Sequence, residues 1–255
     1  MNLKKLIKEY FTILKKEDIN NLSSILNNKC ILYTPFEGEI KGRNNIKKYF
    51  INQKEWLNSK KAKVDVINTI ENNFRIIVEF IIFYDKQEKS IELPAVAVLD
   101  IDNKSINSIR IYHTTWPITG EHVIIKPGLE PEPSLDDPDI ISLYIQGIKN
   151  GDIDFILSLF EDDAYIQEPS GSKFRHHGKM NIEKFYNFAL RNGGIPLKKC
   201  TSTYDGKNFA LEYIFEEWEN KKFKPHAGIA VYEISESGKI SAIRIYDDLS
   251  PYMKN

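Results

Sequence analysis

The chain has 255 residues, of which 42% are hydrophobic, 28% charged and 12% aromatic. This composition is typical of a chain that folds around a core, and it excludes wholesale disorder, which requires low hydrophobicity and high net charge. The 35 basic and 36 acidic residues give a formal net charge of -1, so no excess of charge favours nucleic acid or an anionic membrane as a partner.

The first 18 residues, MNLKKLIKEYFTILKKED, interleave lysines with apolar residues and show neither the apolar core nor the cleavage site of a signal peptide. The longest apolar run, at residues 76–84, is too short to span a membrane. Two cysteines without C-x-x-C spacing indicate reduced thiols. We therefore expect a soluble, cytoplasmic protein without a membrane partner.

In chain order, apolar residues spaced three or four apart predict a helix over residues 3–14, and Asp18 predicts the cap of a short second helix. A strand is expected over residues 30–35, followed by a loop that ends at Gly42 and by a third helix. Strands are then expected over residues 74–84, 93–101 and 106–113. A segment rich in proline and acidic residues predicts a linker over residues 120–136.

The same order of elements recurs after the linker. At one constant offset Tyr10 aligns with Tyr144 and Asp18 with Asp152, and further along AVAVLDI aligns with GIAVYEI and SIRIYHTTWP with AIRIYDDLSP. These matches predict two tandem domains, residues 1–119 and 137–255. Three helices followed by mostly antiparallel strands predict an α+β fold in each, with a curved sheet wrapped around one pocket.

The stretch YIQGIKNGDIDFILSLFEDDAYIQEPSGS, residues 144–172, resembles the opening of ketosteroid isomerase. Both halves are similar to the NTF2-like superfamily, which includes SnoaL-like polyketide cyclases. The resemblance implies two cone-shaped α+β barrels, each with three helices on a curved sheet, that form a pseudo-dimer within one chain; a homodimer is a further option. The resemblance is specific for the fold and not for the function, because this fold hosts isomerases, cyclases, dehydratases, epoxide hydrolases and non-enzymatic binding proteins.

The resemblance also assigns catalytic roles. Glu168, immediately before Pro169, stands at the position of the isomerase's general base, and Tyr144 on the first helix stands at that of its oxyanion-hole tyrosine. The third catalytic residue of that family, an aspartate, is replaced by Ala230. In the first copy Thr34 replaces the base, so the second copy is the expected catalyst.

The pattern of the strands supports further candidates. Glu168 shares a strand face with apolar residues, where desolvation would raise the pKa of its carboxyl. Asp247 ends the apolar face of the last strand, and we expect its neighbour Asp248 to be solvated. His226 shares a face with Ala230 and is a candidate replacement for the missing donor. The expected catalytic residues are therefore Glu168, Tyr144, Asp247 and His226.

Six more residues are expected to bind the substrate, from the first copy or from the loop before the last helix: Tyr10, Thr34, His113, Trp116, His176 and His177. The sequence lacks the H-E-x-x-H and C-x-x-C metal motifs, glycine-rich phosphate loops and the G-x-S-x-G motif. We therefore expect neither a metal nor a cofactor.

Taken together with the resemblance, these patterns predict a cofactor-independent, SnoaL-like enzyme that performs acid–base chemistry next to a carbonyl group. The reaction would be a cyclisation, an isomerisation or a dehydration of an apolar small molecule such as a polyketide or terpenoid. The alternatives are a non-catalytic binding module for an apolar ligand or a protein partner, and a scaffold whose pockets are filled by tryptophan or phenylalanine side chains.

Overall fold

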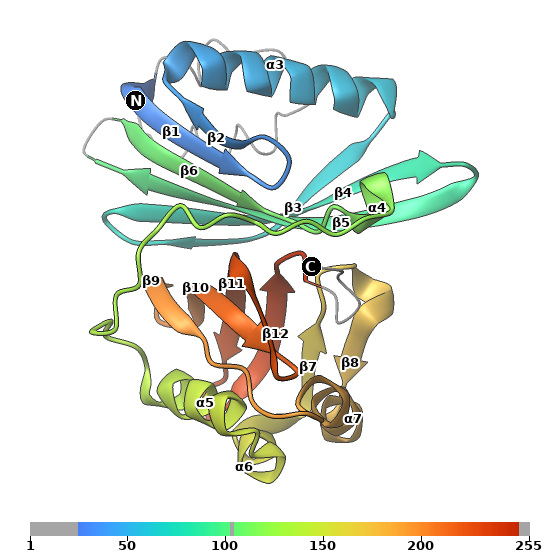
Figure 1. Ribbon diagram of the computed structural model, residues 1–255, viewed down its shortest axis with the longest axis vertical. Coiled ribbons are helices and arrows are strands. Elements are labelled where there is room, and N and C mark those ends of the chain that lie inside the picture. Colours follow the sequence, from blue (N-terminus) through green and yellow to red (C-terminus); the bar gives the residue numbers. More distant parts are fainter. Residues whose placement is uncertain (1–24, 103–104, 250–255) are drawn as a thin grey trace. The chain divides into compact units, whose positions relative to one another are not determined.

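The computed structural model describes residues 25–102 and 105–249, which belong to two compact units, Met1–Glu121 and His122–Asn255 (Figure 1). Each unit contains one six-stranded sheet. The helices expected before residue 25 in the first copy, with Tyr10 on one of them, lie outside the described residues. Within the described ranges, no helix is both long and apolar enough to cross a bilayer.

The first unit orders its strands as β2-β1-β6-β5-β4-β3. Strands β1 and β6 are parallel, and the other neighbours are antiparallel. Its elements are β1 (Leu26–Thr34), β2 (Gly38–Lys41), α3 (Arg43–Ser59), β3 (Lys63–Glu71), β4 (Arg75–Lys86), β5 (Lys89–Ile101), β6 (Ile106–Tyr112) and α4 (Trp116–Thr119).

The second unit repeats this topology in the order β8-β7-β12-β11-β10-β9, again with one parallel pair, β7 and β12. In Figure 1 its helices α5, α6 and α7 all lie on the same side of the sheet. Its elements are α5 (Asp139–Asn150), α6 (Ile153–Ser158), β7 (Phe160–Gln167), the 3-10 turn η1 (Ser172–Phe174), β8 (Arg175–His177), α7 (Lys179–Ala189), β9 (Lys198–Tyr204), β10 (Asn208–Trp218), β11 (Lys221–Ile234) and β12 (Ile240–Tyr246).

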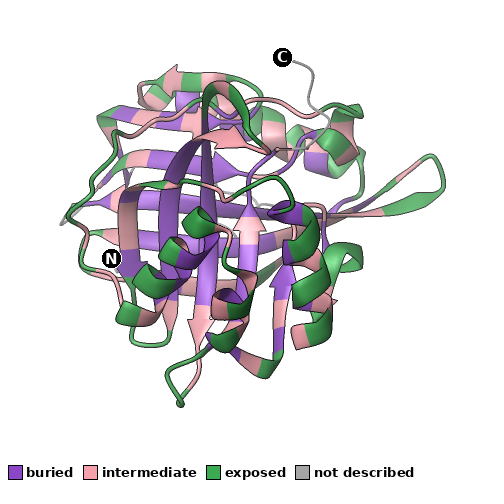
Figure 2. Ribbon diagram, turned by 60° about the horizontal axis from the view of Figure 1, so that its bottom comes forward, coloured by how far each residue is buried: buried purple, intermediate pink, exposed green. Residues whose placement is uncertain are grey.

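The identical strand order confirms the predicted α+β fold in two tandem copies. Among the described strands each sheet is open, because its two end strands pair with one neighbour each, so neither sheet closes into a barrel. Sequence reasoning missed both outer strands, β3 with the sequence KVDVINTIE and β9 with the sequence KKCTSTY. One residue of β3 and two of β9 are buried, so neither strand has the continuous buried face of the inner strands. Figure 2 shows burial concentrated on the strands and exposure on the outer faces of the helices.

The residues expected to form a linker are attached to the second unit, and we call residues 122–137 the strap. The Asp248 carboxylate accepts a hydrogen bond from the Val123 N–H at 2.8 Å and contacts His122 Nδ1 at 2.8 Å. The Ile125 N–H donates to His226 Nδ1 at 3.1 Å. Asp248 is 1% exposed, so the expectation that it is solvated was wrong, because the strap covers it.

A close approach at Gly194 shapes one end of the helical layer. Here the connection between α7 and β9 passes the end of α5, and the Ile195 N–H donates to the Ile148 carbonyl at 2.9 Å. A Cβ atom on Gly194 would lie 2.0 Å from the Lys149 carbonyl oxygen, which is backbone and cannot move aside. Glycine at this position lets Ile195 and Leu197 pack against the core of the second unit.

We expect Gly194→Ala to lower the free energy of unfolding by more than about 2 kcal/mol, because the new methyl group clashes with the backbone carbonyl of Lys149. Urea denaturation measures this change. Gly238→Ala is the matched control: its Cβ meets open space and its cost arises only from a φ of 80°, about 1 kcal/mol. Equal losses in the two variants would contradict the proposed clash.

Candidate functional site

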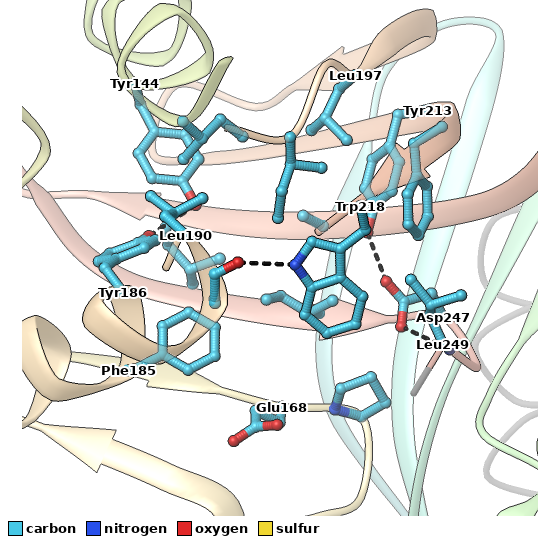
Figure 3. A pocket seen from close by; sticks show the side chains of 18 of the residues that line it. Tyr144, Glu168, Phe185, Tyr186, Leu190, Leu197, Tyr213, Trp218, Asp247 and Leu249 are labelled. Carbon is cyan, nitrogen blue, oxygen red and sulfur yellow. Dashed lines mark hydrogen bonds between the residues drawn. The ribbon is translucent and has the colours of Figure 1, made fainter. Parts of the chain in front are cut away.

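The second unit contains a pocket of about 970 Å³, including its mouth, between the sheet and α7 (Figure 3). Its walls combine eight aromatic residues with aliphatic side chains and proline, and two carboxylates complete the lining. The aromatic residues are Tyr144, Phe185, Tyr186, Phe188, Tyr213, Phe215, Trp218 and Tyr232. The carboxylates are Glu168 and Asp247.

Asp247 is the buried carboxylate of the pocket. It follows the end of β12 and is 9% exposed. Its Oδ2 accepts a hydrogen bond from the Tyr213 hydroxyl at 3.1 Å, and its Oδ1 faces the Leu249 N–H at 3.5 Å. Burial is the main reason why the pKa of Asp247 is raised to about 6. The negative charges of Asp248 and Glu168 also raise this pKa, whereas the two hydrogen bonds lower it. A carboxyl that titrates near neutral pH is suited to general acid–base catalysis.

Two tyrosine hydroxyls form a second polar group in the pocket. Tyr144 on α5 and Tyr186 on α7 are both buried, and their hydroxyl oxygens are 2.8 Å apart. Burial raises the pKa of Tyr144 to about 12 and that of Tyr186 well above its usual range, so both remain protonated. One O–H proton bridges the pair, which leaves the other available to donate to a ligand.

Glu168 lies at the mouth of the pocket, after the end of β7. Its side chain is 37% exposed, and its Oε1 is 2.7 Å from His176 Nε2. The His176 ring lies against Phe185, with ring centroids 4.9 Å apart. Glu168 is therefore the more solvated of the two carboxylates, whereas sequence reasoning placed it as the desolvated base. His177, next along β8, is exposed and does not line the pocket.

His226 lies on the pocket face of β11 as strand alternation predicts, but it is not part of the pocket lining. It pairs with Phe215 across β10 and β11, and the two ring centroids are 5.2 Å apart. Burial lowers the pKa of His226 to about 4, so the ring is neutral. Because its Nδ1 accepts from Ile125, we assign it to holding the strap.

The candidates of the first copy make contacts within their own unit. The Thr34 hydroxyl donates to the Glu37 carboxylate at 2.8 Å, and His113 Nδ1 lies 2.9 Å from the carbonyl of Thr114. Trp116 is 47% exposed at the start of α4. None of these residues lines the pocket.

Sequence reasoning missed Tyr213 and Tyr186 as parts of the site, and it considered Trp218 only as a side chain that could fill a pocket in the scaffold alternative. Tyr213 had a signal: the repeat aligns LEY with VEF, so the second copy has a tyrosine where the first has Phe80. Trp218 lines the pocket, and its Nε1–H donates to the Ala189 carbonyl at 2.7 Å, which ties the end of β10 to the end of α7. That contact depends on tertiary packing and has no local sequence signal.

No protein-family model matches the chain. Solved structures to which parts of the chain are similar include NTF2-like and cyclase-like proteins. An NTF2-like protein of unknown function from Cytophaga hutchinsonii is 16% identical over 43% of this chain and 94% of its own, with a TM-score of 0.38. A putative polyketide cyclase from Sinorhizobium meliloti is 22% identical over 45% of this chain and 99% of its own, with a TM-score of 0.39. An epoxide hydrolase/cyclase-like enzyme of pyran ring formation in the polyether salinomycin is 16% identical over 42% of this chain and 87% of its own, with a TM-score of 0.35.

The burial of Asp247 predicts a pH-dependent effect of Asp247→Asn on stability. Because the carboxyl has a higher pKa folded than unfolded, ionisation destabilises the folded state; the penalty is absent below about pH 4 and complete above about pH 6. Two pKa units correspond to about 3 kcal/mol. We expect the stability of the variant relative to wild type to rise by up to that amount between pH 4 and pH 7.5.

Urea unfolding at the two pH values measures this difference. Asp154→Asn, which changes an exposed carboxylate on α6, serves as the control and should show no comparable rise. An equal stability difference for Asp247→Asn at both pH values would show that its carboxyl titrates normally.

Proposed function

We propose that the second unit is a cofactor-independent catalyst of proton transfer next to a carbonyl group, acting on an apolar small molecule bound in this pocket. The observation that carries the proposal is the buried carboxyl of Asp247, whose pKa of about 6 makes it a base at neutral pH. It shares the pocket with aromatic and aliphatic walls that would hold the rest of the substrate.

In this mechanism the ionised Asp247 accepts a proton from the carbon next to the carbonyl. The electrons of the broken C–H bond form a C=C bond, and the π electrons of the carbonyl group move to its oxygen, which gives an enolate. The Tyr144–Tyr186 pair donates a hydrogen bond to that oxygen and keeps its own protons, because the pKa of both hydroxyls is raised. The Tyr213 hydroxyl fixes the orientation of the base.

The enolate is the common intermediate of the three reactions expected from the sequence. Return of the proton from Asp247 to another carbon isomerises the substrate. Transfer of that proton to a β-hydroxyl group lets the group leave as water, which dehydrates the substrate. Attack of the enolate carbon on a second carbonyl closes a ring, and the same proton neutralises the new alkoxide. The apolar lining also supports a non-catalytic function, because apart from Asp247 and Glu168 every lining residue is aromatic, aliphatic or proline. A module that only binds an apolar ligand is therefore the second candidate.

Deuterium exchange of an apolar cyclic ketone such as 2-decalone in D₂O tests the first step without knowledge of the natural substrate. We expect the wild-type protein to accelerate loss of the proton signals next to the carbonyl in NMR spectra, at a rate that rises with pH through about 6. Asp247→Asn should lower the protein-dependent rate by ~10²–10⁴. Asp154→Asn should leave it unchanged.

Binding of the ketone is followed in parallel through tryptophan fluorescence, because Trp218 lines the pocket. A ketone that binds without faster exchange, or exchange that survives Asp247→Asn, would overturn the catalytic role and leave the binding module as the function of the unit.

A further inference from the structure

The charges that face the pocket all have one sign. Asp247 lies inside it and Glu168 at its mouth, and the charge of Glu168 contributes to the raised pKa of Asp247. Among the described residues that line the pocket, none is a lysine, arginine or histidine. His176 contacts Glu168 from outside the lining. The pocket therefore repels an anionic ligand and has no cation of its own beside Asp247.

Aromatic rings make up much of the wall around this negative charge. In Figure 3 the Trp218 indole lies in the middle of the pocket, with Asp247 on one side of it and Phe185 on the other. Tyr213 and Phe215 project from the same strand as Trp218. Aromatic faces carry a partial negative charge and attract organic cations, most strongly where water is excluded. The carboxylate and the aromatic rings therefore both favour an organic cation as the ligand.

We propose that the ligand of this pocket is an apolar amine that is protonated at neutral pH, with its ammonium group against Asp247 and the aromatic faces and its hydrocarbon body along the aliphatic wall. This inference rests on the proposed function and narrows its substrate class to molecules that carry an amine besides the carbonyl group. A bound ammonium group lowers the pKa of Asp247 toward its ordinary value, so the carboxylate stays ionised at a lower pH while the amine is bound.

Two probes of the same shape test the proposal: phenyltrimethylammonium, which carries a permanent charge, and tert-butylbenzene, in which carbon replaces the nitrogen. Dissociation constants are measured through tryptophan fluorescence between pH 5 and pH 8. At pH 8 we expect the cation to bind at least tenfold more tightly. Its affinity should rise with pH through about 6, as Asp247 ionises beside Tyr213, Asp248 and Glu168, while that of tert-butylbenzene stays constant.

Asp247→Asn should abolish the preference for the cation and leave the affinity for tert-butylbenzene within about twofold of wild type. Asp154→Asn, at an exposed site on α6, should keep the preference. The pH series uses the wild-type protein and so tests the proposal even where the Asp247 variant folds poorly.

If tert-butylbenzene binds as tightly as the cation or more tightly, or if the preference for the cation survives Asp247→Asn, the amine is overturned as the ligand. The pocket would then remain a binding site for apolar molecules. Failure of both probes to bind the wild-type protein would overturn the pocket as a ligand site, and the inference with it. A cation preference without ketone exchange would remove only the catalytic role.

Discussion

The burial of one carboxyl group, that of Asp247, is the constraint on which the site depends. A carboxylate is costly to remove from water unless hydrogen bonds replace its hydration. The Tyr213 hydroxyl supplies one of them, and the sheet makes room for this ring: Gly228 stands opposite Tyr213, where a Cβ atom would lie 2.8 Å from the ring. The hydrogen bonds do not cancel the cost of burial, and the carboxyl therefore titrates near neutral pH.

The two copies share a topology and differ in this pair of residues. Where the second copy has Tyr213 and Asp247, the repeat aligns Phe80 and His113 in the first. Phe80 lies opposite Ala95, as Tyr213 lies opposite Gly228, so the backbone register is the same while the chemistry is not. The strap adds a further feature of the second unit, since His122 and Val123 hold Asp248, the residue next to the buried base. The same topology therefore carries different side chains at equivalent interior positions of the two units.

The features predicted well from the sequence are those with a local or repeated signal. The internal repeats predicted the two copies, and the alternation of side chains along the last strand predicted that Asp247 faces the pocket. Asp152 caps α6 as expected. Which of two carboxylates is desolvated depends on how α7 and β10 close the pocket, and sequence reasoning chose Glu168. Burial of Asp248 and the neutral state of His226 arise from strap contacts between residues more than 100 positions apart, as in the pair Ile125 and His226, which no local pattern records.

The most direct test of this account is the titration of the Asp247 carboxyl itself, followed by the ¹³C chemical shift of its side-chain carbon in NMR spectra and assigned by its absence in Asp247→Asn. A midpoint near pH 6 is expected from burial in the apolar pocket. A midpoint near pH 4, the ordinary value for aspartate, would mean that water reaches the carboxylate freely, and the proposed base and the proposed ammonium site would both lose their physical foundation.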